Sequence, residues 1–362
     1  MKKRLALLGA SGYTGADFLR LGLNHPGIDF VALSAERQAG KQVDDLWPHL
    51  QAHTLPVMQS VDDIDFKGLN LDAVVTCLPH ATTHAVLTKI LADTDHILLG
   101  GSGADFKIID LSADFRLRDT NTYAEWYGGD HALPDLQPMA TYGLTELYRD
   151  QIKQSGLVAC PGCYPTAALL TLLPLIKAGV IQTEGIHIDA KSGVTGAGRG
   201  LKEANLFAEV AEAMHPYGLG GHRHTPEIEQ EIAAFAGEVP EQVRVQFVPH
   251  LIPINRGELV TITAKLSDSE DVSTARAVLK DTYDDETFVH LLPEGRAPQT
   301  RMVRGSNTCV LNAFEARAPG RIILVAAIDN LVKGSSGQAM QNFNLMMGFE
   351  EGTALQQVAM FP

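Results

Sequence analysis

At 362 residues the chain is longer than one hydrophobic core usually supports, so two domains are expected. A hydrophobic fraction of 45% with 20% charged residues is typical of a globular protein, and the sequence contains no apolar stretch long enough to span a bilayer. The net charge of −14 argues against a nucleic-acid partner, and four cysteines are too few for a disulfide scaffold, which favours the cytoplasm.

The first predicted element is an apolar strand over residues 5–8, followed by a glycine-rich turn and a helix from Ala16. The basic N-terminus resembles a signal peptide, but the apolar run is too short for one. The turn has the pattern G-x-x-G-x-x-G, in which glycines let the backbone approach a pyrophosphate held at the helix N-terminus. The predicted dinucleotide contacts are Gly9, Ser11, Gly12, Tyr13, Thr14 and Gly15.

The second strand, over residues 30–33, ends at Ser34, where an NAD-preferring protein usually presents a carboxylate to the ribose 2′-hydroxyl. Here Ser34, Arg37 and Lys41 offer a hydroxyl and two positive charges, which suit a 2′-phosphate. This favours NADP as the cofactor, although Glu36 in the same loop leaves NAD open.

A further strand over 72–79 and a returning helix over 81–91 continue the alternation, so Pro79 is expected at the ligand-binding end of a parallel strand. Residues 93–105 read as a surface connection without chemistry. The next strand has a polar tip at Arg116, which can clamp a carboxylate or a phosphate, or pair structurally with a neighbouring aspartate. Residues 123–147 are predicted to be irregular.

Cys163 follows a Pro-Gly pair and precedes an apolar helix predicted over 166–176. Pro165 lies where a first helical turn accepts proline. The unpaired N–H groups and the dipole of a helix N-terminus favour a thiolate, although most free cysteines are simply small buried apolar residues. The pattern therefore predicts a candidate nucleophile.

After this helix the apolar residues alternate at 185–190, 243–248 and 259–266, which is typical of a half-exposed antiparallel sheet. A second glycine-rich loop, 191–200, lacks the lysine of a phosphate-binding P-loop. A strand beginning at Arg321 and a helix over 337–347 are expected to return to the first domain.

Two histidines, His222 and His224, precede a helix expected to begin at Thr225 and Pro226. Histidine supplies an acid or a base near neutral pH. An H-x-H pair can also bind a metal, but no companion zinc motif is present, so no metal is predicted.

The elements together predict an α/β protein: a Rossmann-type doubly wound parallel sheet plus an α+β domain with a mixed, largely antiparallel sheet. Residues 1–163, completed by 328–362, are the predicted NADP-binding domain, and residues 164–327 the catalytic and dimerisation domain.

Six motifs give the chain a resemblance, over nearly its whole length, to the N-acetyl-gamma-glutamyl-phosphate reductases. These are NADP-dependent enzymes of arginine biosynthesis within the aspartate-semialdehyde dehydrogenase superfamily. The chain departs from the family pattern at 93–105, which is longer than usual. The motifs are 9–15, 111–116, 161–166, 192–198, 222–227 and 329–334.

The resemblance implies that Cys163 attacks N-acetyl-gamma-glutamyl phosphate and that NADPH reduces the resulting thioacyl group. It implies that His222 pairs with the thiolate and acts as acid/base. The substrate candidates are Arg116 and His224, and the further cofactor candidates are Ser192, Gly193 and Asn330. A homo-oligomer, either a dimer or a tetramer, is expected, with no nucleic-acid or membrane partner.

Three other functions stay open. A related enzyme could reduce another acyl phosphate, as aspartate-semialdehyde dehydrogenase does, and a non-catalytic protein could bind NADP without forming an acyl-enzyme. The C-x-x-C spacing of Cys160 and Cys163 also occurs in thiol–disulfide oxidoreductases, although these are much smaller.

Replacing Cys160 with alanine separates the two cysteine chemistries. A reductase that uses only Cys163 keeps most of its acyl-phosphate-dependent NADPH oxidation, whereas a thiol–disulfide oxidoreductase loses disulfide reduction because it needs both sulfurs. Both activities are measured spectrophotometrically on wild type and Cys160→Ala. Loss of NADPH oxidation in the well-folded variant contradicts the assignment of Cys160 as a bystander.

Overall fold

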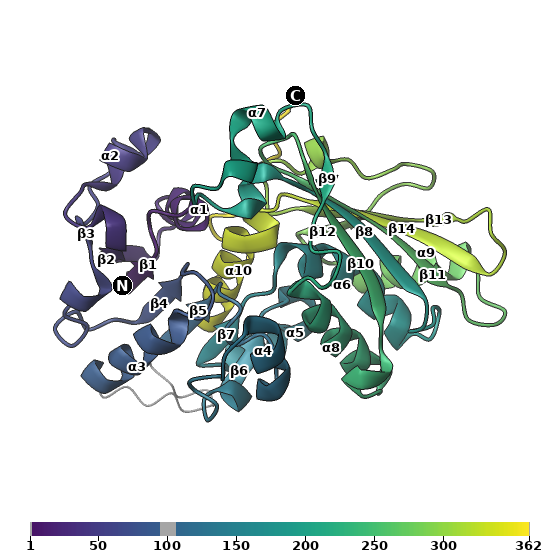
Figure 1. Cartoon of the computed structure of the whole chain (residues 1–362), viewed down its shortest axis with the longest axis horizontal. Helices are drawn as coiled ribbons and strands as arrows, with labels where there is room; N and C mark the ends of the chain where they lie inside the picture. The colour runs from purple at the N-terminus through teal and green to yellow at the C-terminus, as the bar shows by residue number, and fades with distance from the viewer. Residues whose placement is uncertain (1, 95–105, 362) are drawn as a thin grey trace. The chain divides into compact units, whose positions relative to one another are not determined.

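The computed structural model describes residues 2–94 and 106–361 (Figure 1). The chain forms two compact units, one of residues 1–161 with 335–356 and the other of residues 162–334 with 357–362. Residues 328–334, which the sequence assigns to the N-terminal domain, group with the second unit. The predicted surface connection lies outside the described residues from 95 onwards.

The sheet of the first unit has seven parallel strands in the order β3-β2-β1-β4-β5-β7-β6. The order reverses between β1 and β4, so the loops that follow these two strands flank the switch point where open α/β sheets bind ligands. The strands are β1 (Lys3–Leu8), β2 (Ile28–Ser34), β3 (Met58–Gln59), β4 (Ala73–Thr76), β5 (Lys107–Asp110), β6 (Ala140–Tyr142) and β7 (Leu157–Ala159).

The C-terminal helix α10 (Gly337–Met346) completes this unit, packing against α1 and α5. Its start is anchored to α1 because the Ser336 hydroxyl donates to Asp17 Oδ2 at 2.9 Å, and both residues are buried. The other helices of the unit are α1 (Tyr13–Gly22), α2 (Val43–Leu46), α3 (Thr83–Thr94), α4 (Thr120–Tyr127) and α5 (Thr145–Gln154).

The prediction that residues 123–147 are irregular is wrong. They include most of α4, the strand β6 and the start of α5. Asp119 caps α4 by accepting hydrogen bonds from the N–H groups of Asn121 and Thr122. The three residues of β6 pair with β7, and so short a strand leaves no readable period in the sequence.

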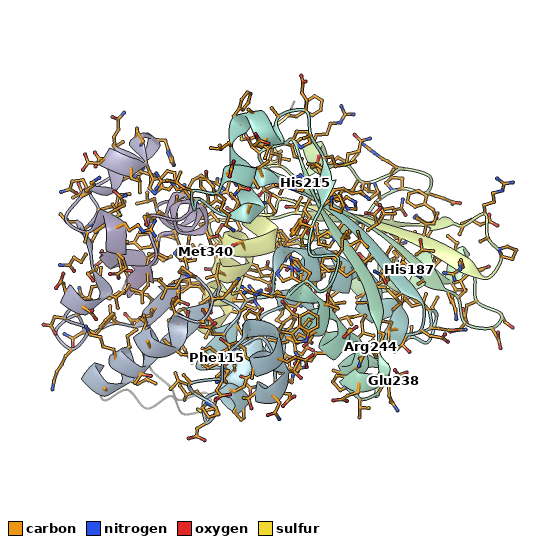
Figure 2. The ribbon with its side chains drawn as sticks, viewed as in Figure 1. Phe115, His187, His215, Glu238, Arg244 and Met340 are labelled. Atoms are coloured by element: carbon orange, nitrogen blue, oxygen red, sulfur yellow. The ribbon has the colours of Figure 1, made fainter. Side chains whose placement is uncertain are left out.

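The second unit contains a mixed sheet in the order β12-β13-β14-β11-β8-β10-β9, in which four of the six strand pairs are antiparallel. Burial alternates along its strands: on β8, Ile186 and Ile188 are buried while His187 between them is exposed (Figure 2). The strands are β8 (Ile186–Gly193), β9 (His215–Pro216), β10 (Val245–Ile252), β11 (Glu258–Lys265), β12 (Val289–Leu291), β13 (Cys309–Glu315) and β14 (Arg321–Ile328).

Helix α6 (Cys163–Lys177) is the central helix of this unit and packs on β11 and β14 as well as on α8 and α9. Every residue from Tyr164 to Ile176 is buried, which explains why its sequence is apolar on all sides. The other helices are α7 (Phe207–Val210), α8 (His224–Ala236) and α9 (Val272–Tyr283).

The two sheets confirm the predicted fold class. Several helix starts differ: α1 begins at Tyr13 instead of Ala16, and α6 begins at Cys163 instead of residue 166. Helix α8 begins at His224, one residue before the predicted cap Thr225. Among the described helices, none combines the length and the apolar character that a membrane crossing demands.

Replacing Gly9 with alanine tests how tightly the turn after β1 is packed. Gly9 has φ +88°, and an added Cβ would lie 2.3 Å from the carbonyl oxygen of Cys77. Gly40 has φ +85° with open space around its Cβ position, so Gly40→Ala is the matched control. Strain alone costs roughly 1 kcal/mol, and the clash raises the cost of Gly9→Ala to about 3 kcal/mol. Equal unfolding free energies of the two variants in urea contradict this packing.

Candidate active site

Cys163 is the first residue of α6, and its side chain is partly exposed. The preceding residue, Gly162, is the N-cap and has no side chain that could cap the helix. The N–H of Gly162 donates to Glu227 Oε1 at 2.9 Å, and its carbonyl accepts from both the N–H and the hydroxyl of Thr166. The backbone on which Cys163 sits is therefore held from both sides.

Glycine is required beside the cysteine in two places. A Cβ on Gly162 would lie 2.3 Å from Nε2 of His224, so this imidazole lies directly against the backbone before Cys163. A Cβ on Gly334 would lie 2.7 Å from Cβ of Cys163, so the loop after β14 packs against the cysteine itself. The environment of the sulfur is thus built from segments about 60 and 170 residues away along the chain.

The loop after β14 is organised by two buried polar side chains. Asp329 accepts hydrogen bonds from the N–H groups of Leu331 and Val332 and lies 3.5 Å from the Arg256 guanidinium. Asn330 accepts from the N–H of Gly257 at 2.8 Å and donates to the Thr195 hydroxyl at 2.9 Å. The Asn330 amide therefore links this loop to the segments that precede β11 and follow β8.

His222 lies among aromatic rings close to the cysteine helix. Its ring centroid is 6.1 Å from that of Tyr164, 5.4 Å from that of Tyr217 and 4.7 Å from that of His224. Burial, assisted by the positive charge of Arg223, lowers the pKa of His222 to about 4. The imidazolium form that a thiolate–imidazolium ion pair needs is therefore disfavoured in this structure.

The hydrogen bonds of His222 also define its tautomer. Its Nδ1 accepts the backbone N–H of His224 at 3.1 Å. A neutral imidazole has one donor and one acceptor nitrogen, so the proton of the neutral ring resides on Nε2. His222 in this arrangement can donate from Nε2, and it accepts a second proton only by losing the bond to His224.

The structure adds Glu258, a residue that the sequence does not single out. Glu258 is the first residue of β11 and is fully buried. Burial raises the pKa of its carboxyl to about 8, with the Cys163 thiol acting in the opposite direction through a hydrogen bond and the charge of Asp329 raising it further. Its sequence context, a polar residue opening an alternating strand, gives no signal of this burial.

The glycine turn of the first unit has the predicted strand–turn–helix form. The N–H of Gly9 donates to the carbonyl and the hydroxyl of Ser34, both at 3.1 Å. A Cβ on Gly15 would lie 2.3 Å from the carbonyl oxygen of Gly9, so helix and turn are in backbone contact. Gly12 is the N-cap of α1 without a side-chain cap, and Tyr13 and Thr14 open the helix. These features fit a dinucleotide pyrophosphate.

The loop after β2 divides its charges between two roles. Ser34 is buried and holds the glycine turn. Glu36 accepts hydrogen bonds from the Ser60 hydroxyl at 2.8 Å and from the N–H of Val61 at 3.0 Å. Arg37 and Lys41 are exposed. The Glu36 carboxylate is thus hydrogen-bonded within the unit. Arg37 and Lys41 remain at the surface, where a 2′-phosphate site requires positive charge.

Arg116 is buried in the first unit. Its Nε donates to the carbonyl of Cys160 at 2.8 Å and its Nη2 to that of Leu111 at 3.1 Å. These bonds brace the backbone between β7 and α6, so a role in substrate binding stays a prediction. Cys160 is buried, and burial raises the pKa of its thiol to about 12.

The remaining predicted cofactor residues are divided between the units. Ser11 and Pro79 belong to the first unit. Ser192 and Gly193 close β8 in the second unit, where Asn330 also lies. Gly193 is tightly enclosed, since an added Cβ would lie 2.7 Å from the carbonyl oxygen of Asn255.

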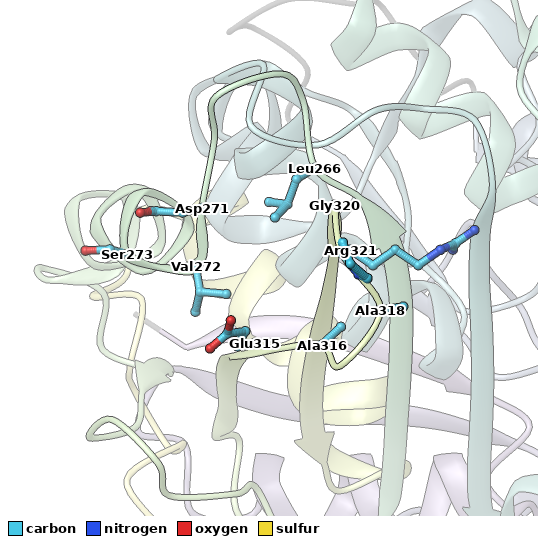
Figure 3. Close-up of a pocket in the computed structure, with 10 residues that line it drawn as sticks. Leu266, Asp271, Val272, Ser273, Glu315, Ala316, Ala318, Gly320 and Arg321 are labelled. Carbon is cyan, nitrogen blue, oxygen red and sulfur yellow. The ribbon is translucent and has the colours of Figure 1, made fainter.

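Two cavities of the second unit differ in their relation to Cys163. One, of about 290 Å³, lies where β11 ends and β14 begins, beside Leu266 and Arg321 (Figure 3). It is roughly 25 Å along β11 from Glu258, so it is separate from the cysteine site. The other, of about 340 Å³, adjoins the start of β11 and is lined in part by Arg256, Arg301 and Arg304, a chemistry suited to anions.

Comparison with known proteins identifies the class of enzyme whose fold this chain shares. Residues 4–155 match the family described as "Semialdehyde dehydrogenase, NAD binding domain", and residues 163–330 match "Semialdehyde dehydrogenase, dimerisation domain". An aspartate semialdehyde dehydrogenase II from Vibrio cholerae shares the fold with a TM-score of 0.70 at 16% identity, over 96% of this chain and 99% of that chain. Another from Candida albicans, solved with NADP, has a TM-score of 0.64 at 16% identity over the same shares. The chain has the semialdehyde dehydrogenase architecture.

Relatives with higher sequence identity show which family within this class the chain belongs to. A probable chloroplastic N-acetyl-gamma-glutamyl-phosphate reductase of Oryza sativa is 50% identical over 99% of this chain and 82% of its own length. An N-acetyl-gamma-glutamyl-phosphate reductase of Afipia carboxidovorans is 47% identical over 99% of both chains. The chain belongs to the N-acetyl-gamma-glutamyl-phosphate reductase family.

Titration of His222 tests its neutral state. The depressed pKa means that the unfolded chain takes up this proton near pH 6.5 while the folded chain does so only near pH 4. The contribution of neutral His222 to stability is therefore complete above pH 6.5 and is lost as the pH falls towards 4. NMR titration of the imidazole signals, assigned with His222→Asn, should give an apparent pKa near 4. A value at or above 6.5 contradicts a neutral His222.

Proposed function

We propose that this protein reduces N-acetyl-gamma-glutamyl phosphate with NADPH to N-acetylglutamate semialdehyde and phosphate, a step of arginine biosynthesis. The observation that supports it most directly is the partly exposed Cys163 at an N-terminus without a side-chain cap, in a chain about half identical to relatives with this name. Acyl-phosphate reduction needs such a nucleophile, because a thioester accepts hydride readily.

The reaction begins when the Cys163 thiolate attacks the acyl carbon. The C–S bond forms, and the C–O bond to phosphate breaks with its electron pair leaving on the phosphate. The backbone N–H groups at the start of α6 stabilise the tetrahedral oxyanion, an effect worth about 3 kcal/mol per donor in comparable sites. We propose His222 as the acid/base partner of Cys163, and its neutral ring carries on Nε2 a proton that it can give to the substrate oxygen.

When bound, NADPH would provide the hydride that reduces the thioester carbon. The glycine turn over 9–15 would hold its pyrophosphate, and Arg37 would face a 2′-phosphate. The other residues proposed for the cofactor are Ser34, Pro79, Ser192, Gly193 and Asn330. After reduction the C–S bond breaks, and Cys163 is released as the semialdehyde forms.

We assign substrate binding to His224 and Arg116. His224 lies against Gly162, directly beside the nucleophile, and this position supports a role in substrate binding. The hydrogen bonds of Arg116 to backbone carbonyls support an indirect part, in which it holds the segment leading to Cys163. The matching dimerisation domain supports a homo-oligomer, for which we propose a dimer or a tetramer in the cytoplasm.

Replacing Cys163 with serine tests the covalent route. Turnover of N-acetylglutamyl phosphate should fall by about 10³-fold or more, because a hydroxyl is a poor nucleophile without a strong base, while NADPH binding followed by fluorescence stays nearly unchanged. Cys160→Ala is the matched control and should remain active. Aspartyl phosphate is assayed alongside on wild type. Preference for aspartyl phosphate would replace the proposed substrate with that of an aspartate-semialdehyde dehydrogenase, and an active Cys163→Ser variant would exclude the thioacyl route.

A further inference from the structure

The loop that follows β4 contains a residue in an unfavourable backbone conformation. Ala81 has φ +63°, in the left-handed region that a residue with a Cβ rarely adopts. Its side chain is exposed, so packing of the methyl group does not account for the conformation. Backbone strain of this kind persists only where the surrounding structure holds it, and it is concentrated at functional sites.

The strained residue belongs to a loop that begins beside the glycine turn. We name residues 77–82 the β4 loop. The N–H of Cys77 donates to the carbonyl of Leu8 at 2.7 Å, and a Cβ on Gly9 would lie 2.3 Å from the carbonyl oxygen of Cys77. Residues 79–82 are exposed, and the sheet order reverses between β1 and β4. A dinucleotide held by the glycine turn therefore lies next to the β4 loop.

The side chain that holds the β4 loop in place is the carboxylate of Asp114, which is completely buried. Its Oδ1 accepts the N–H of Ala81 at 2.7 Å. Its Oδ2 accepts the N–H of Thr83, the first residue of α3, at 3.1 Å. The two oxygens thus fix the backbone on either side of Thr82, and one of them holds the strained residue itself.

Asp114 is in turn held by its surroundings. Its Oδ1 also accepts the hydroxyl of Tyr123 at 3.2 Å, and its N–H donates to the Ser112 hydroxyl at 3.1 Å. Its carbonyl accepts from Nε2 of His131 at 2.8 Å, and that ring lies against the buried ring of His84. A carboxylate fixed in this way can maintain strain in its partner, because it cannot move to relieve it.

We propose that Asp114 is a positioning residue for the cofactor, which holds the β4 loop in the strained form that receives the dinucleotide bound at the glycine turn. The assignment rests on the proposed use of NADPH. It gives a role to the acidic residue of the motif over 111–116. A carboxylate that only capped α3 would need the bond to Thr83, whereas the bond to Ala81 acts on the exposed part of the loop.

Both backbone N–H groups need an acceptor at the same time, and only a carboxylate provides two. An asparagine has one accepting oxygen, so one of the two N–H groups then faces an NH2 group. When the bond to Ala81 is lost, this residue relaxes towards a negative φ and the strained loop becomes a minor state. The apparent affinity for the cofactor then falls in proportion to the population of the competent loop.

Fluorescence titration with NADPH tests the proposal on wild type and Asp114→Asn. The Kd for NADPH should rise about 10-fold, because one buried N–H loses its acceptor, while kcat at saturating NADPH stays within about 3-fold of wild type. Tyr123→Phe is the matched control. It removes a donor to the same carboxylate oxygen but leaves both bonds to the loop, so the Kd should change by less than about 2-fold.

Replacing Ala81 with glycine separates positioning from a general loss of structure. Glycine adopts a positive φ without strain, so the double variant Asp114→Asn, Ala81→Gly should recover several-fold of the lost affinity. If Asp114→Asn does not fold, Ala81→Val in the otherwise wild-type chain replaces it. A β-branched residue disfavours φ +63°, so this variant should also bind NADPH about 10-fold more weakly.

Equal NADPH affinities of wild type and Asp114→Asn overturn the proposal, as does a loss of affinity that glycine at position 81 does not reduce. Unchanged affinity of Ala81→Val overturns it where that variant is used. If wild type binds NADPH without reducing the acyl phosphate, the proposed function fails, whereas the titrations still decide the role of Asp114. Melting temperatures within a few degrees of wild type establish that each variant is folded.

Discussion

The close approach of three backbone segments at the start of α6 is the constraint on which the cysteine site depends. Gly162 leaves room for the His224 ring on one side, and Gly334 leaves room for Cys163 on the other. A Cβ at Gly162 would force the His224 ring to move, and a Cβ at Gly334 would clash with Cys163, so the two glycines let these segments pack closely around the cysteine. The Glu227 carboxylate then holds the turn through the N–H of Gly162.

This enclosure determines the electrostatics of the site. Removing water disfavours the charged form of every titratable group, whatever the sign of its charge. The same burial therefore lowers the pKa of His222 to about 4 and raises that of Glu258 to about 8. The outcome is a site in which burial favours the neutral form of the histidine and of the carboxyl alike.

Local patterns in the sequence predicted most of the fold and part of the site. The glycine turn, the alternating strands of the second sheet and the cysteine at the start of an apolar helix are short-range signals, and each is present in the structure, although α1 and α6 begin three residues earlier than predicted. Strand β6 was missed because three residues carry no period, and the start of α8 was displaced because His224 is an unusual first helical residue. Arg116, expected at a ligand, is occupied in part by backbone carbonyls that only folding brings to it.

The sequence by itself determined the elements, the doubly wound order of the first unit and the identity of the candidate nucleophile, because these depend on spacing within about 20 residues. Tertiary structure alone decided what surrounds the sulfur. Glu258 is about 95 residues from Cys163 along the chain, and its buried position at the start of β11 follows from the pairing of that strand with β8 and β14. The protonation state of His222 likewise depends on its burial among aromatic rings that come from distant parts of the chain. A residue's protonation is set by the solvent it loses on folding, and that loss is a property of the packed chain rather than of any local motif.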